Sequence, residues 1–311
     1  MKYINLFLAL IISNVSATIE NSEEVIHKNP LLQAPKILTD TEIEELSNNW
    51  QTSFEWRCGY KLNFECYYSR GKSSCILRFC NIPLRSYNFQ YIENLKKLIE
   101  NYKQNNNYSY YYETPLKFAN PNPQKIDLET LCNLIKDKNF IFYTGAGISA
   151  SKVATMKALD NAIKIDKNFS AFLKEIFFSP QRISDAFKEF CKTAIYSEPT
   201  EAHYALHKIA QIKKVAILTE NVDLLQQRTT SMPIFVHSDT LTNLKKQDFE
   251  EIDFIICIGL SHDDCGFIAH YKKQNPDGRI ISVDLGVPNY LSESDFLIQE
   301  DIQQFLPRFQ T

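Results

Sequence analysis

Three features that would indicate particular classes of protein are missing from this 311-residue chain. Its formal net charge is −3 at pH 7, so it lacks the basic surplus that neutralises nucleic-acid phosphates or holds an anionic membrane surface. The apolar run near its start is far shorter than the roughly 20 residues that span a bilayer. Its clustered cysteines do not have the C-x-x-C spacing that zinc prefers. We therefore expect no nucleic-acid partner.

The first residues are typical of an export signal. Met1 and Lys2 form a short basic start, and Leu6 to Ile12 form the apolar run. The small residues Val15, Ser16 and Ala17 then match what a signal peptidase accepts. We predict a signal peptide over residues 1–17, a secreted or periplasmic mature protein, and no stable membrane anchor after cleavage. A buried N-terminal strand is the alternative interpretation of the same run.

Residues 18–123 are predicted to form a separate N-terminal region of unknown role. Export permits disulfides, so we expect one or two of them among four clustered cysteines, with three connectivities possible. These cysteines are Cys58, Cys66, Cys75 and Cys80. The segment around Arg70-Gly71 is predicted to be a hairpin. The proline-rich stretch "ANPNPQ" is interpreted as the linker to a second domain over residues 124–311.

The second domain alternates short apolar strands with amphipathic helices. The predicted strands are "NFIFYTG", "KVAILTEN", "PIFVHS", "FIICIGL" and "RIISVDL". Helices are predicted at "KIDLETLCNLIKDK" and "TEAHYALHKIAQI", with more between residues 161 and 196. This alternation predicts an α/β fold with a doubly wound parallel sheet, which binds ligands beyond the carboxyl ends of its strands. We therefore expect a common edge formed by Gly145, Asn221, His237, Gly259 and Asp284.

The stretch "FYTGAGISAS" places a glycine-rich turn directly after a strand. Gly145, Ala146 and Gly147 would let backbone N–H groups approach a pyrophosphate. A plain tight turn is the alternative. A dehydrogenase needs an acidic residue at a strand end about 20 positions later, but Asp160 and Asp166 lie in helical sequence. No G-K-[ST] follows, which excludes a Walker loop.

Several further elements follow one another in a fixed order along the chain. They are the T-G-A-G-I-S turn at Thr144–Ser149, a P-x-x-x-H-x-x-L helix at Pro199, His203 and Leu206, a T-Q-N-x-D-like segment at Thr219–Asp223, a histidine at His237, a G-T-S-like element at Gly259–Ser261, and the closing strand and tail. In these elements the chain resembles the sirtuin family, the NAD-dependent protein deacylases, from residue 126 to residue 309. The resemblance implies a sirtuin-like, Rossmann-type domain with NAD as its substrate or cofactor.

The resemblance also implies residue roles. It places Ser149, Asn221 and Asp223 around the nicotinamide and its ribose, and His237 as the base that removes a hydroxyl proton. Asn221 and His237 are therefore the predicted catalytic residues, and Asp284 is predicted to accept from the adenosine ribose. The predicted cofactor-binding residues are Gly145, Ala146, Gly147, Ser149, Asn221, Asp223, Gly259, Ser261 and Asp284.

Three departures from the family pattern affect the expected reaction. The nicotinamide-clasping G-I-P-D-F-R loop is replaced by Val153–Ala158, where Lys157 is the only candidate substitute charge. The two cysteine pairs of the family's zinc module are missing between His237 and Gly259, so we predict no metal site. Glu220 replaces the family's glutamine and adds negative charge beside the site.

These observations predict an exported enzyme that cleaves the nicotinamide–ribose bond of NAD, with water or a protein acceptor capturing the ADP-ribosyl group. NAD-dependent protein deacylation is the alternative, and an inactive module that binds NAD or ADP-ribose is a further one. Three smaller predictions accompany this. Cys257 is a core residue, His262-Asp263-Asp264 is a solvated loop, and the i, i+4 pair His203 and His207 belongs to helix structure rather than to a metal.

Overall fold

The computed structural model describes residues 29–46, 64–66, 77–79, 112–153, 193, 197–221, 223–236 and 238–309. The predicted signal peptide, the loop of the cysteine cluster, the segment 154–192 and His237 lie outside the described residues. Among the described residues, no helix is both long and apolar enough to cross a membrane.

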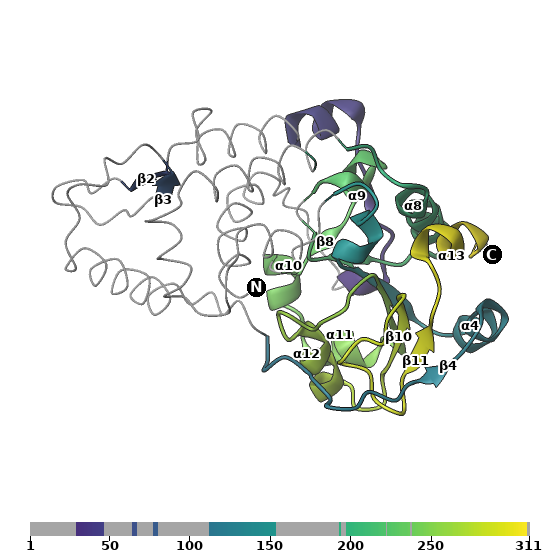
Figure 1. The fold of residues 1–311 in the computed structure, drawn as a ribbon. Helices are drawn as coiled ribbons and strands as arrows, with labels where there is room; N and C mark the ends of the chain where they lie inside the picture. The colour runs from purple at the N-terminus through teal and green to yellow at the C-terminus, as the bar shows by residue number, and fades with distance from the viewer. Residues whose placement is uncertain are drawn as a thin grey trace, which may run out of the picture.

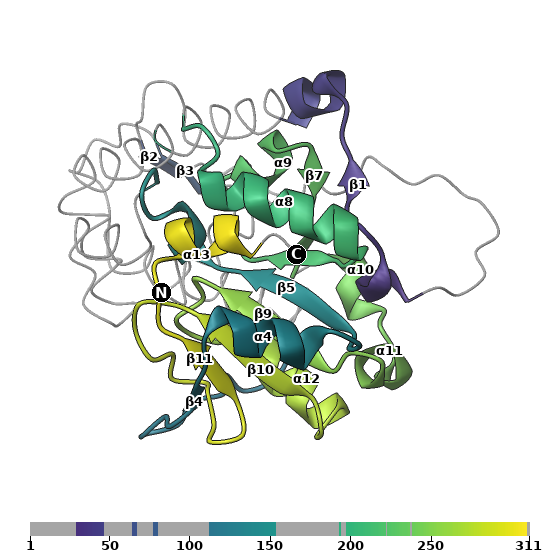
Figure 2. The same ribbon diagram turned by 90° about the vertical axis from the view of Figure 1, so that its right-hand side faces the viewer.

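The core is a seven-stranded sheet in which every neighbouring pair of strands is parallel. Figures 1 and 2 show this sheet and the helices that cover it. In spatial order the strands are β4 (Gln124–Lys125), β11 (Phe296–Ile298), β10 (Arg279–Val283), β9 (Phe254–Ile258), β5 (Phe140–Thr144), β6 (Ile217–Thr219) and β8 (Ile234–Phe235). The predicted doubly wound α/β fold is confirmed.

The strand order contains a reversal of direction. From β5 the chain builds outward through β6 and β8, then returns to the other side of β5 and builds outward through β9, β10 and β11. The topological switch point therefore lies between β5 and β9. In open parallel sheets, ligands bind at this point beyond the carboxyl ends of the strands.

The two faces of the sheet are covered by different helices. One face packs against α4 (Leu128–Ile135), α8 (Glu201–Lys213) and α13 (Ile302–Arg308), which lie together in front of the sheet in Figure 2. The other face packs against α10 (Asp239–Thr242), α11 (Lys246–Glu250) and α12 (Phe267–Gln274). Because strand side chains alternate, Phe140 and Phe142 of β5 join the first core, while Ile141 and Tyr143 join the second. Cys257 is fully buried in this second core, as predicted.

Local sequence explains where two of the helices begin. Asp127 caps α4 by accepting a hydrogen bond from the Thr130 N–H at 2.9 Å. Asp301 caps α13 in the same way, accepting from the Gln303 N–H at 2.9 Å. Both α4 and α8 were predicted from their periodicity, whereas the short strands β4 and β11 were not.

Two stretches that precede residue 124 pack on the sheet. The 3₁₀ turn η2 (Pro30–Leu32) buries Leu31 in the second core, and β1 (Lys36–Ile37) pairs antiparallel with β7 (Ser231–Met232). Residues 112–118 follow the same face, where the Leu116 N–H donates to Asp263 at 3.0 Å. Sequence periodicity did not indicate these contacts, because each stretch contributes only a few apolar residues.

The predicted N-terminal hairpin is partly described. Strand β2 (Phe64–Cys66) pairs antiparallel with β3 (Leu77–Phe79), so the two strands enclose the predicted turn at Arg70-Gly71. The pairing of the cysteines lies outside the described side chains.

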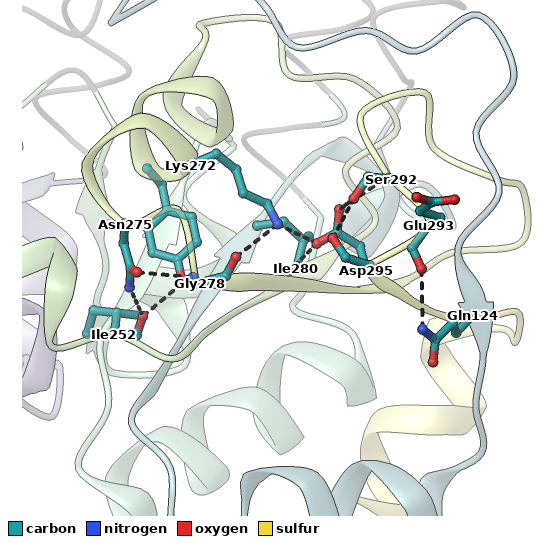
Figure 3. Close-up of polar contacts among 11 residues, drawn as sticks. Gln124, Ile252, Lys272, Asn275, Gly278, Ile280, Ser292, Glu293 and Asp295 are labelled. Atoms are coloured by element: carbon teal, nitrogen blue, oxygen red, sulfur yellow. Dashed lines mark hydrogen bonds and ion pairs between the residues drawn. The ribbon is translucent and has the colours of Figure 1, made fainter.

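A buried ion pair holds the amino end of β10, opposite the switch-point edge. Asp295 is completely buried and accepts hydrogen bonds from Lys272 Nζ at 2.6 Å and from the Ile280 N–H at 2.8 Å. Ser292 donates to the same carboxylate through its hydroxyl at 2.6 Å and its N–H at 2.9 Å (Figure 3). The carboxylate is therefore fully hydrogen-bonded, which is what a buried charge requires.

Candidate functional site

Four of the five residues predicted to share one edge do so. Gly145 directly follows β5, Gly259 follows β9, Asp284 follows β10, and Asn221 lies two residues beyond β6. Because these strands are parallel neighbours, their carboxyl ends meet at the same edge. The fifth residue, His237, lies outside the described residues.

The glycine turn contacts the neighbouring loop backbone to backbone. The Gly147 N–H donates to the Gly259 carbonyl oxygen at 2.9 Å, and the Gly145 N–H donates to the Ile258 carbonyl oxygen at 3.0 Å. A Cβ on Gly147 would lie 2.6 Å from the Gly259 Cα, closer than real Cβ contacts. Gly259 also has a positive φ of 61°. At these two positions the bare backbone joins the β5 and β9 loops, and the N–H groups of Gly145 and Gly147 are hydrogen-bonded within the protein.

Replacement of Gly259 by alanine is expected to lower the free energy of unfolding by about 2–5 kcal/mol, since it combines backbone strain at positive φ with a clash. Its Cβ would meet the Gly147 Cα at 2.6 Å. Gly286→Ala in the next loop is the matched control, because the nearest atom to its Cβ lies 3.7 Å away. Urea unfolding measures both variants. Equal stability of the two would contradict this account of the turn.

Asn221 is fixed against the glycine turn. Its side-chain Nδ2 donates to the Gly145 carbonyl oxygen at 3.0 Å, and its N–H donates to Thr219 Oγ1 at 3.0 Å. The Thr144 hydroxyl in turn donates to Thr219 Oγ1 at 2.8 Å, across β5 and β6. The amide of Asn221 is thereby oriented by two neighbouring strand ends, and its Oδ1 is the acceptor it offers to a ligand.

Ser149 lies beside a buried histidine whose tautomer follows from its contacts. The Thr200 N–H, which can only donate, points to His203 Nδ1 at 3.2 Å, so Nδ1 is the acceptor. The proton is therefore on Nε2, which lies 3.3 Å from Ser149 Oγ and donates to it. Burial lowers the pKa of His203 to about 4, although the nearby Asp223 charge raises it. His203 thus stays neutral at pH 7.

This arrangement excludes a serine nucleophile of the hydrolase kind. A general base would have to accept the Ser149 proton at Nε2, yet that nitrogen is the donor. Asp223 is 8% exposed and accepts the Leu225 N–H at 3.0 Å. That hydrogen bond leads into the short helix α9 (Leu225–Arg228). Ser149, His203 and Asp223 instead form a buried polar cluster beside the glycine turn.

The histidine pair on α8 is used for protein contacts. Both ring nitrogens of His203 are hydrogen-bonded to protein groups, and His207 Nδ1 bonds the hydroxyl of buried Ser231. Their i, i+4 spacing therefore serves capping and packing. Among the described residues, no cluster of three metal-ligating side chains occurs.

Ser261 and Asp284 meet where β9 and β10 end. The Ser261 hydroxyl donates to one carboxylate oxygen of Asp284 at 3.4 Å, and the Gly286 N–H donates to the other at 2.9 Å. Next to them, Leu285 is 69% exposed. Asp284 is the residue that the resemblance assigns to the adenosine ribose, and Ser261 lies beside it at this edge.

The predicted solvated loop His262-Asp263-Asp264 needs a correction. His262 is exposed, but Asp263 is 1% exposed and accepts from three backbone N–H groups. These are the N–H groups of Leu116 at 3.0 Å, Ile268 at 2.9 Å and Ala269 at 3.0 Å. Asp263 therefore ties the N-terminal stretch and the start of α12 together. Sequence alone could not show this, because Leu116 lies far from Asp263 in the chain, although Ile268 and Ala269 lie close to it.

Glu220 also differs from the expectation of a plain negative charge. Its carboxyl accepts hydrogen bonds from the Tyr143 hydroxyl and from Cys265 Sγ, the latter at 3.0 Å. Burial raises the pKa of Glu220 to about 7, against the lowering effect of these two donors. The carboxyl therefore holds its proton more strongly than an exposed glutamate does. Sequence reasoning missed this cluster. Alternation of side chains along β5 and β6 could have indicated that Tyr143 and Glu220 lie on the same face of the sheet.

No protein-family model and no curated protein matches the sequence. Among solved structures, a Sir2 protein bound to an acetylated peptide is 16% identical at a TM-score of 0.46, covering 59% of this chain and 97% of that chain. A Sir2–p53 peptide–NAD⁺ structure is 15% identical at 0.45, with the same coverage. An ADP-ribose complex of a Sir2 homologue mutant is 17% identical at 0.44, covering 59% of this chain and 95% of that chain. The strand order of this chain itself establishes the doubly wound α/β fold class.

Proposed function

We propose that this protein is a sirtuin-like enzyme that cleaves the nicotinamide–ribose bond of NAD. The observation that carries the proposal is the gathering of Ser149, Asn221 and Asp223 beside the glycine turn at the switch-point edge. These three side chains come from separate segments and are the ones that the resemblance assigns to the nicotinamide and its ribose. Small, oriented polar groups at this edge suit a nucleotide substrate.

Each residue has a role in this proposal. Asn221, held by Gly145 and Thr219, presents its Oδ1 to a ribose hydroxyl or to the attacking water. Ser149 accepts a hydrogen bond from Nε2 of neutral His203, so its own hydroxyl is free to donate to a substrate acceptor. Asp223 accepts from the carboxamide NH₂. His237 removes the hydroxyl proton, as the resemblance implies.

Water is the acceptor we favour for the ADP-ribosyl group. The sequence has no cysteine pairs between His237 and Gly259, so it lacks the module that forms one wall of the acyl-lysine channel in deacylases. Transfer to a protein side chain would use the same bond cleavage. Deacylation remains the second candidate, because Asn221, Asp223 and His237 are all retained.

The test is to incubate the full-length mature protein with NAD, alone and with an acetyl-lysine peptide. We expect nicotinamide and free ADP-ribose from NAD alone, and no acetyl-ADP-ribose when peptide is added. Positioning a second substrate contributes roughly 7–11 kcal/mol to a bimolecular step, so a true deacylase would depend strongly on peptide. Acetyl-ADP-ribose formed at a rate that follows peptide concentration would establish the second candidate. Binding of NAD without turnover in either case would indicate an inactive module.

A further inference from the structure

The strand ends at the switch point present different side chains to the two faces of the sheet. On β5 and β6, Thr144 and Thr219 lie on the face of α8, where Ser149 contacts His203. Tyr143 lies on the opposite face, in the second core. Glu220, one position beyond Thr219, therefore also turns to that opposite face, where it reaches Tyr143. The proposed NAD site thus has a carboxyl group on its far side.

Tyr143, Cys265 and Glu220 form a closed hydrogen-bonded cluster. The tyrosine hydroxyl and the thiol both donate to Oε1 of Glu220, and they lie 3.2 Å from each other. Burial raises the pKa values of Tyr143 and Cys265 well above their usual range, so both remain protonated donors. The other charged groups that act on Glu220 are Asp264 and Asp263, whose negative charges also raise its pKa.

The cluster is joined directly to the candidate site through the backbone. The Glu220 N–H donates to the Thr144 carbonyl oxygen at 3.2 Å, just before the glycine turn. Asn221 follows as the next residue and bonds Gly145. Because adjacent Cα atoms are about 3.8 Å apart, a charge on Glu220 lies within about 10 Å of a ligand held at this edge. At that range in a partly buried setting, one charge alters the binding of another.

We propose that the cluster of Glu220, Tyr143 and Cys265 sets the affinity of the switch-point edge for anionic dinucleotides, with protonated Glu220 as the tight-binding form. The inference rests on the proposed function, since it assumes that a pyrophosphate binds at this edge. Glutamine at position 220 would be neutral at every pH. Glutamate at this position makes binding depend on pH, and the hydrogen bonds from Tyr143 and Cys265 influence the pH at which binding changes.

The direction of the pH effect on binding follows from the charge of the Glu220 carboxyl. Below about pH 6 the Glu220 carboxyl is neutral, and above about pH 8 it is charged, because its pKa is about 7. The dissociation constant for a pyrophosphate ligand should therefore rise with pH across this window. We expect an increase of about 3- to 10-fold at low ionic strength, the size produced by a unit charge at about 10 Å.

The experiment measures ADP-ribose binding by calorimetry at pH 6, 7 and 8 in the full-length protein. ADP-ribose is used because the enzyme does not consume it. In Glu220→Gln the increase attributed to this carboxyl should disappear, while affinity at pH 6 stays close to that of the wild type. Any titration of His237 contributes equally to both proteins. The change of Kd in the wild type relative to that in Glu220→Gln is therefore the quantity to compare.

A second variant tests the cluster itself. Tyr143→Phe removes one donor to the carboxylate, so the pKa of Glu220 should rise and the midpoint of the pH dependence should move upward. Tyr290→Phe is the matched control, because this buried tyrosine donates to the Leu260 carbonyl oxygen at 2.7 Å instead. It should leave the midpoint in place.

The outcomes distinguish failure of the role of Glu220 from failure of the proposed function. Binding with the same pH dependence in wild type and Glu220→Gln would overturn this inference and leave the proposed function standing. A midpoint that moves equally in Tyr143→Phe and Tyr290→Phe would also overturn it. An absence of ADP-ribose binding at every pH would contradict the proposed function itself, and the inference with it.

Discussion

Replacement of Asn221 by alanine is expected to lower the rate of nicotinamide release from NAD by about 10²–10⁴-fold, because both positioning and proton transfer depend on the hydroxyl or water it orients. The side-chain amide donates to the Gly145 carbonyl oxygen at 3.0 Å, and the backbone N–H of the same residue donates to Thr219 Oγ1 at 3.0 Å. His237→Ala should cause a loss of similar size, with activity in the wild type rising with pH as the imidazole loses its proton. Chromatographic detection of nicotinamide at saturating NAD measures both.

Asn139→Ala provides a matched control for Asn221→Ala. The Asn139 amide donates to the Glu251 carbonyl oxygen at 2.9 Å, the same kind of bond, but it lies at the amino end of β5 rather than beyond its carboxyl end. We expect this variant to lose some stability and to keep its turnover. Wild-type turnover in both Asn221→Ala and His237→Ala would refute the assignment of the site. An equal loss in Asn139→Ala would mean that the effect is structural.

Replacement of Lys272 by methionine is expected to lower the free energy of unfolding by about 3 kcal/mol, because it leaves a buried charge without its counter-ion. Asp295 is 0% exposed, and its bond to Lys272 Nζ is 2.6 Å long (Figure 3). The remaining donors, Ile280 and Ser292, keep the carboxylate hydrogen-bonded but do not neutralise it. Urea unfolding at pH 7 gives the value. Turnover of the folded protein should be retained, since this pair lies at the amino ends of the strands.

The neighbouring lysine provides the control. Lys273 forms an ion pair with Glu113 at 2.5 Å, but its side chain is 64% exposed. Exposed pairs contribute about 0–1 kcal/mol, so Lys273→Met should change stability by no more than that. A loss equal to that of Lys272→Met would show that burial of the carboxylate is not what matters.

Much of the fold could be predicted from the sequence because the signal is local. The central strands β5, β9 and β10 are nearly continuous apolar runs, as expected of strands buried on both faces, and α4 and α8 have helical periodicity. Alternation of such strands with such helices then predicts a parallel sheet. The short outer strands β4 and β11 lack such a signal, since 2 and 3 residues carry no period. Their places depend on pairing with segments far away in the chain.

The sequence by itself determined which residues stand at the carboxyl edge, because the end of a buried strand and the residue after it are visible in the chain. Only the tertiary structure decided what those residues do there. Gly147 and Gly259 contact each other, and His203 is a neutral donor to Ser149. The carboxyl of Glu220 accepts hydrogen bonds from Tyr143 and Cys265. The contacts to Ser149 and Glu220 join residues 45 or more positions apart, although the His203 tautomer itself is fixed by Thr200, three residues away. The pKa of a buried carboxyl depends on such distant partners and on its burial, which no local pattern encodes.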